Sequence, residues 1–239
     1  MSADRKHYAL LAEILDHPNP DFPQRVAALR ELLAGKYPEA YQHMLQFESM
    51  LPGDGGTFSI AEQEAQQELF VRTFQVQGIT TMDVGYIAFG DDYKRAELMV
   101  NLVREHRDAG VDCGDELPDH LPNILKLLAV WEDEENVTEM VHELLLPAVN
   151  AMAFEFSQER TEARNKLYRK HHKTLIDASD NLVEMYRHPL CAVASVLKAD
   201  FGINDTTERH LDSEFLRSLG RELDIEARGA GKRGIAKEA

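Results

Sequence analysis

A carboxylate and an imidazole stand side by side at Asp119-His120, between two prolines in the stretch from 116 to 122. Such a pair can act in general acid–base catalysis, but it would need a nucleophile. The sequence has no Gly-x-Ser-x-Gly elbow and no cysteine signature that would supply one. Two interpretations stay open: Asp119 caps the following helix while His120 packs or bonds locally, or both residues line a binding groove.

The other motifs with chemical potential fail in their context. The glycine pattern at 229–234 matches a dinucleotide fingerprint, but no strand precedes it and no helix follows it. The His-Glu dipeptide at 142–143 begins a zinc-protease pattern, yet Leu146 stands where the second histidine should be. Neighbouring histidines on a helix point about 100° apart, so the pair at 171–172 is expected to be solvated. We therefore predict no catalytic residues, no cofactor and no metal site.

Four aromatic residues, Phe70, Phe74, Tyr86 and Phe89, are denser than one helix needs. Packing in the core is the default interpretation. A partly open apolar groove is the alternative, because aromatic and methionine side chains suit adaptable peptide recognition.

An apolar helix must position the Asp-His pair. Its apolar residues recur at the spacing of one helical face, which must meet a core: Leu121, Ile124, Leu125, Leu128 and Trp131. With Asp119 as N-cap, Pro122 falls at the third helical position, where no intrahelical donor is lost.

Local signals predict further helices along the chain. The boundary signals are two capping boxes (Asp21 with Gln24, Ser59 with Glu62), Pro38 at a helix start, Asp91 or Asp92 as a cap, and Gly35 and Gly110 as helix ends. Segment 76–90 is expected to be a loop and a short helix, because its β-branched residues have no partner strand. The next helix is expected to bury Ala96, Met99, Leu102 and Val103. Pro147 is expected to kink a later helix.

The chain is expected to form one all-helical domain over residues 1–200. Its last parts would be a helical region at about 162–187 and an apolar helix at about 190–198. Residues 201–239 are expected to hold a short helix near 212–223 and a flexible, basic, glycine-rich tail.

Composition limits the class of partner. The 239 residues are 44% hydrophobic and 28% charged, as in a globular protein. The 42 acidic residues against 26 basic ones give a net charge of -16, which disfavours nucleic acid and suits a cationic partner, although solubility alone explains it as well. No apolar run approaches the roughly 18 residues of a membrane span, and no apolar signal region follows the polar N-terminus. Cys113 and Cys191 are expected to be free thiols in a cytoplasmic protein.

The stretch Glu-Leu-Pro-Asp-His-Leu-Pro at 116–122, followed by an apolar helix, resembles the signature of the NarJ branch of the redox-enzyme maturation chaperones. These are dedicated assembly chaperones of molybdoenzymes, related to TorD and DmsD. Weaker elements agree in order: a leucine-rich helix at 10–18, Phe70 and Phe74 in a Tyr-x-x-x-Phe-like element, Gly90-Asp91 followed by Arg95, and His106 with Gly110. The resemblance covers residues 8–131 and extends loosely to about 200. Phe70 replaces the usual tyrosine, and Gln75 stands where an aspartate is common.

The resemblance implies a TorD-like multi-helix bundle that is not an enzyme and needs no cofactor. It would bind the N-terminal segment of the apo catalytic subunit of a molybdopterin oxidoreductase and assist molybdenum-cofactor insertion before targeting. It would act as a monomer or a helix-swapped homodimer. The implied client-binding residues are Glu116, Pro118, Asp119, His120, Leu121, Pro122, Phe70, Phe74, Tyr86 and Phe89.

Two other functions are alternatives. An all-α, metal-dependent phosphohydrolase would use histidine and aspartate ligands, but its usual His-Asp dipeptide is absent, since Asp16-His17 and Asp119-His120 run in the opposite order. A helical adaptor unrelated to metalloenzymes is the other alternative.

Overall fold

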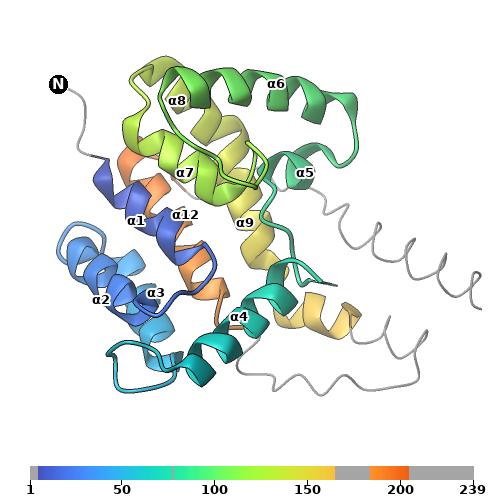
Figure 1. The fold of residues 1–239 in the computed structure, drawn as a ribbon. Coiled ribbons are helices and arrows are strands. Elements are labelled where there is room, and N and C mark those ends of the chain that lie inside the picture. The colour runs from blue at the N-terminus through green and yellow to red at the C-terminus, as the bar shows by residue number, and fades with distance from the viewer. Residues whose placement is uncertain (1–4, 77, 165–183, 205–239) are drawn as a thin grey trace, which may run out of the picture.

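The computed structural model describes residues 5–76, 78–164 and 184–204 (Figure 1). Within these ranges the chain folds into helices joined by loops, and no residue belongs to a strand, which confirms the predicted all-α class. The helices are α1 (Lys6–Ile14), α2 (Phe22–Leu33), α3 (Pro38–Met50), α4 (Ile60–Phe74), α5 (Val84–Phe89), α6 (Tyr93–Asp108), α7 (Leu121–Val130), α8 (Glu134–Met140), a π-helical turn η1 (Val141–Leu145), α9 (Leu146–Phe154) and α12 (Arg187–Phe201). Residues 158–164 form a further helical stretch.

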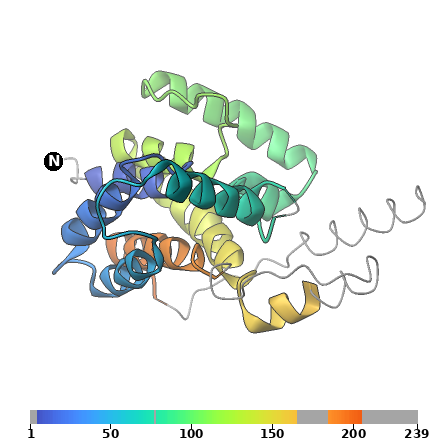
Figure 2. The same ribbon diagram turned by 60° about the horizontal axis from the view of Figure 1, so that its bottom comes forward.

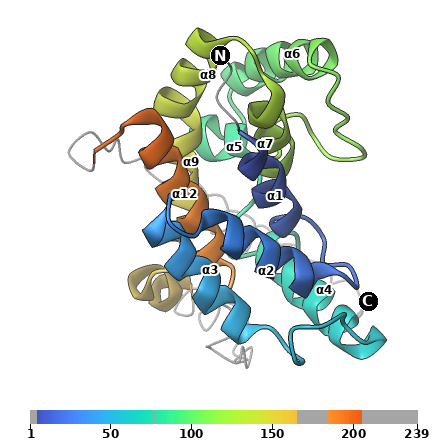
Figure 3. The same ribbon diagram turned by 90° about the vertical axis from the view of Figure 1, so that its left-hand side faces the viewer.

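The core lies where α1, α3, α7, α9 and α12 meet. Helix α12 packs along both α3 and α9, and α1 lies along α7 (Figures 1 and 3). The whole predicted apolar face of α7 is buried: Leu121, Ile124, Leu125, Leu128 and Trp131. Helix α12 also buries an apolar face and is longer than the predicted 190–198. Hydrophobic burial therefore fixes α7, and with it the end of the loop that carries the Asp-His pair.

Helix starts follow most of the local signals. Pro38 begins α3, and the capping box of Ser59 and Glu62 closes at the start of α4, both as predicted. Asp21 is the N-cap of α2, but its side chain makes no capping bond, so that predicted capping box is wrong. The side-chain amide of Gln24 instead donates a hydrogen bond to Thr57 Oγ1, in the loop before α4, at 3.2 Å.

The segment between α4 and α6 is a loop followed by the short helix α5, as predicted. Asp92 caps α6 by accepting a hydrogen bond from the Lys94 N–H at 2.9 Å. Gly110 follows the end of α6 with a φ of 69°, the left-handed backbone that favours glycine.

Close to Pro147, where a kink is predicted, the helix contains the π-helical turn η1, which directly precedes α9. A proline has no N–H for the helical ladder and its ring crowds the preceding turn. The helix accommodates Pro147 by widening one turn before it, as π-bulges do.

Helix α6 differs most from expectation. Its buried residues are Leu102 and His106. Of the four residues predicted to be buried, only Leu102 is, because Met99 is partly buried and Ala96 and Val103 are exposed. Figure 2 shows α6 at the edge of the molecule.

Several predictions lie outside the described residues. They are most of the helical region at 162–187, the short helix near 212–223 and the basic tail.

Candidate functional site

The Asp-His pair lies in a loop that is bonded to the loop before α5. The Val84 N–H donates to the Asp119 carbonyl oxygen, and the Leu121 N–H donates to the Met82 carbonyl oxygen, each at 2.9 Å. These two bonds form an isolated antiparallel bridge around Asp83 and His120. The bridge sets the start of α7 beside the start of α5.

The carboxylate of Asp119 is fully buried and pairs with Arg95 of α6. Arg95 Nε donates to Asp119 Oδ2 at 2.9 Å, and Arg95 Nη2 lies 3.4 Å from Oδ1. A buried charge needs such a partner. The capping interpretation is therefore wrong: α7 begins at Leu121, His120 is its N-cap without a side-chain capping bond, and Pro122 is the second helical residue rather than the third.

Asp83 extends this ion pair to the imidazole. Its Oδ2 accepts from Arg95 Nη2 at 3.0 Å, and its Oδ1 lies 3.3 Å from His120 Nδ1. Burial alone would raise the pKa of Asp83, but the bond to His120 and the charge of Arg95 outweigh it and lower that pKa. We call Asp83, Arg95, Asp119 and His120 the clasp.

Gly85 is required by the clasp. A Cβ at this position would lie 2.6 Å from Asp119 Oδ2 and 3.0 Å from Leu98 Cδ2. Only glycine lets α5 approach the buried carboxylate this closely. The ring of Tyr86, the next residue, faces the Arg95 guanidinium at 5.4 Å from its centroid.

A second polar contact holds the other end of α6. His106 is buried, with Nδ1 2.8 Å from the Leu102 carbonyl oxygen and Nε2 3.2 Å from the Asn123 carbonyl oxygen of α7. The Asn123 amide in turn donates to the carbonyl oxygens of Cys113 and Leu117, at 3.2 and 3.0 Å. Together with the clasp, this contact attaches helices α5 and α6, which we call the arm, to α7.

The aromatic residues divide between the core and the surface. Phe70 and Phe74 are buried, and their ring centroids lie 5.6 and 5.2 Å from that of Tyr186. Their default interpretation as core residues holds, and they line no open groove. Tyr86 and Phe89 of α5 are partly buried.

The remaining predicted site residues also divide in this way. Asp119, Leu121 and Pro122 are buried, His120 and Pro118 are partly buried, and Glu116 is exposed. Of the predicted set, the groups that a partner can reach therefore lie in the 116–120 loop and on α5.

Two features were missed from the sequence. Arg95 had no assigned role, although it stands at helical spacing with Leu98, Leu102 and His106, which marks the inner face of α6. The outer face carries a second apolar stripe. Tyr93, Val100 and Val103 are 68%, 71% and 53% exposed, with the small, exposed Ala96 between them.

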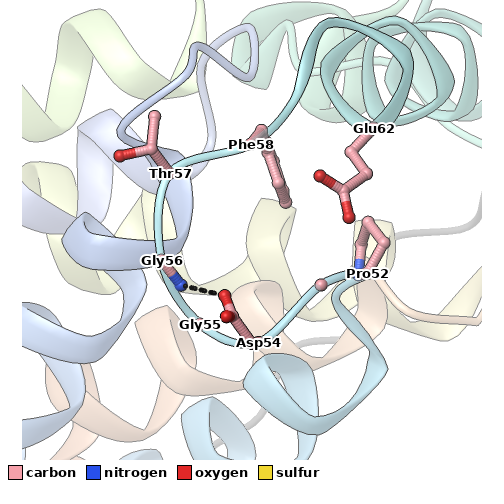
Figure 4. Close-up of a pocket in the computed structure, with 8 residues that line it drawn as sticks. Pro52, Asp54, Gly55, Gly56, Thr57, Phe58 and Glu62 are labelled. Carbon is pink, nitrogen blue, oxygen red and sulfur yellow. Dashed lines mark hydrogen bonds between the residues drawn. The ribbon is translucent and has the colours of Figure 1, made fainter.

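A separate pocket of about 390 Å³ lies inside the 52–58 loop, and Glu62 forms part of its wall (Figure 4). Two of its acidic side chains bond locally. The Glu62 carboxylate accepts from Ser59 Oγ at 2.7 Å, and Asp54 Oδ1 accepts from the Gly56 N–H at 3.2 Å. These bonds hold the loop in shape.

Comparison with known protein families finds no match for this sequence, and no curated protein is significantly similar to it. Among the described residues, no helix is long and apolar enough to cross a membrane. In the same residues, no group of three or more histidine, cysteine, aspartate or glutamate side chains is placed to hold a metal ion.

Proposed function

We propose that this chain is a dedicated assembly chaperone of a molybdoenzyme. It would bind the N-terminal segment of the apo catalytic subunit, hold that subunit competent for cofactor insertion and release it before targeting. The chain itself would catalyse no reaction in this role. The basis is the resemblance of residues 116–122 and the accompanying elements to the NarJ-type chaperones, together with the all-α fold.

One observation supports this function most directly. Asp119 of the signature and Arg95 of a second resembling element are 24 positions apart, yet they form a buried ion pair. Two motifs of the same resemblance thus act on a single structural task, which is to attach the arm to α7.

The arm also offers a surface for a client segment. The exposed stripe of Tyr93, Val100 and Val103 runs for about 15 Å along α6, enough for roughly three turns of an amphipathic helix. The bases at the end of the stripe, Arg104 and Arg107, are paired with acids next to them.

Acidic residues adjoin the arm in the sequence. The loop that returns from α6 to α7 carries exposed Asp112, Asp115 and Glu116. An amphipathic, basic client segment therefore fits this side of the molecule better than an acidic one.

Co-purification tests the function. The full chain carrying an affinity tag is co-expressed with the apo catalytic subunit of a molybdopterin oxidoreductase from the same genome, and recovery of that subunit is measured. We expect a complex that is lost when the N-terminal segment of the subunit is deleted. Failure to recover any such subunit would refute the chaperone function.

A pair of variants locates the surface. Val100→Asp places a charge in the α6 stripe and should lower recovery of the client about tenfold or more. Val76→Asp is the matched control, because Val76 is 66% exposed and lies after α4, outside the α6 stripe. Equal recovery with both variants would move the docking surface away from α6 while leaving the chaperone function standing.

A further inference from the structure

His43 of α3 and His188 of α12 face each other across the contact between these helices, which we call the seam. Their Nδ1 atoms lie 3.4 Å apart, and their ring centroids are 5.7 Å apart. The two residues are 145 positions apart in the chain, so only the fold brings them together. Both side chains are partly buried, which leaves an approach from solvent.

The distance between the two nitrogens is long for a hydrogen bond between imidazoles. Nitrogen donors in proteins usually lie about 2.7–3.2 Å from their acceptors. A zinc ion bound at about 2.0–2.1 Å by two nitrogens with a tetrahedral angle between them would hold those nitrogens about 3.3–3.4 Å apart. The two imidazoles form a long hydrogen bond at 3.4 Å, and the same separation matches that of two nitrogen ligands of one metal ion.

Buried aromatic residues next to the two histidines fix the distance between His43 and His188. Phe47 stands one helical turn after His43 and is fully buried, and Tyr186 stands two residues before His188 and is also fully buried. Their ring centroids lie 5.6 Å apart. Because this aromatic contact holds α3 and α12 together next to the histidines, little would need to move on binding an ion.

Charged neighbours on both helices act on the pair in opposite directions. Glu39, one turn before His43 on α3, favours a cation there, and Arg187, adjacent to His188 on α12, opposes one. With neutral imidazoles as the ligands, the ion would need to tolerate nitrogen donors and exchangeable water. Zinc, nickel and copper have this preference, whereas magnesium and calcium prefer oxygen.

We propose that His43 and His188 form a two-histidine site for a divalent transition-metal ion, with water in the remaining positions. The ion would cross-link α3 and α12 and so stabilise the core. This site is independent of the client-binding function, and it revises the expectation from the sequence that the chain has no metal site.

Metal titration of the full chain tests the site. Protein without a histidine tag is freed of metal with a chelator, and the midpoint of thermal unfolding is followed as Zn²⁺ or Ni²⁺ is added. Because binding to the folded state raises stability by mass action, the midpoint should rise with metal concentration. His43→Gln and His188→Gln should each weaken binding about tenfold or more, as measured by calorimetry.

Histidines elsewhere provide the controls. His142→Gln removes an exposed histidine, and the double variant His171→Gln/His172→Gln removes the adjacent pair. Both should bind as the unmodified chain does. Metal binding that survives in the His43→Gln/His188→Gln double variant at full affinity, or that is lost in either control, would overturn the site.

Nuclear magnetic resonance of the unmodified chain tests the site without depending on the folding of any variant. Paramagnetic Ni²⁺ should broaden the imidazole resonances of His43 and His188 before those of other histidines. Broadening that begins elsewhere would also overturn the site.

Discussion

The side chains that hold α12 in the core are mainly apolar, whereas those that hold α6 against the rest of the molecule include charged and polar groups at both ends. Helix α12 buries Pro189, Leu190, Ala192, Val193, Ala194, Val196 and Leu197. Helix α6, of similar length, buries only Leu102 and His106, and its Arg95 enters the clasp. Near the end of α12, exposed Asp200 accepts hydrogen bonds from Tyr37 Oη at 2.6 Å and Lys36 Nζ at 3.0 Å.

This difference has a consequence for motion. Apolar burial is non-directional and is spread over many contacts. A buried ion pair depends on both partners, and loss of one leaves the other without compensation. We therefore expect the arm to open as a unit while the seam stays closed, and each prediction below breaks or sharpens that contrast.

The largest effect is expected in the seam, from Phe47→Ala. Phe47 is fully buried and its ring contacts those of Phe22 and Tyr186, so the substitution should lower the free energy of unfolding by about 3–5 kcal/mol. Urea denaturation measures this loss. Phe154→Ala is the control, because Phe154 is 46% exposed, and it should lower stability by less than about 1 kcal/mol. Similar losses in the two variants would mean that the seam is not the main source of stability.

Asp119→Ala breaks the clasp. The expected loss is about 3 kcal/mol, at the low end for a broken buried pair, because Arg95 is 18% exposed and keeps Asp83. Hydrogen exchange should show faster exchange in α5 and α6 with little change in α12. Asp108→Ala removes an exposed partner of Arg107 on the same helix and should change stability by less than about 1 kcal/mol.

The helices in which hydrogen exchange accelerates show whether the arm opens separately from the core or unfolds with it. If Asp119→Ala accelerates exchange in α12 as much as in α6, the arm and the core unfold together and the contrast between them fails.

Gly85→Ala disturbs the clasp by adding a side-chain atom on α5. The added Cβ would lie 2.6 Å from Asp119 Oδ2, so α5 must shift and the stability should fall by about 1–3 kcal/mol. Gly56→Ala is the control, since its Cβ would meet only the end of the exposed Asp54 side chain, at 3.1 Å. Hydrogen exchange should again change in the arm alone. Unchanged exchange in Gly85→Ala would show that the added Cβ fits beside Asp119 without displacing α5.

Local features of the fold could be predicted from sequence, and features that join distant segments could not. The apolar face of α7, the start of α3 at Pro38 and the capping box at Ser59 depend on residues within a turn or two of each other. The role of Asp119 depends on Arg95, and a residue that looks like a cap can be recruited by a cation elsewhere in the fold.

The buried face of α6 could be predicted only in part, because it too depends on residues that are distant in the sequence. Hydrophobicity favours burial of Ala96 and Val103, yet the fold buries His106 and draws in Arg95 because both find polar partners there. The existence of helix α6 could therefore be predicted, but not which of its faces is buried.

The smallest effect is expected from acid, acting on Asp83 in the clasp. The pKa of Asp83 is lowered in the folded state, so the unfolded chain takes up the proton first as the pH falls. The contribution of Asp83 to stability is thus present above about pH 4 and lost as the pH falls through the folded pKa. Because Asp83 is 25% exposed, Asp83→Asn should cost at most about 1 kcal/mol at neutral pH and less at pH 3. Exchange in the arm, corrected for its intrinsic pH dependence, measures this convergence, with exposed Asp21→Asn as the control. A cost of Asp83→Asn that is the same at pH 3 and pH 7 would mean that its carboxylate charge does not hold the arm.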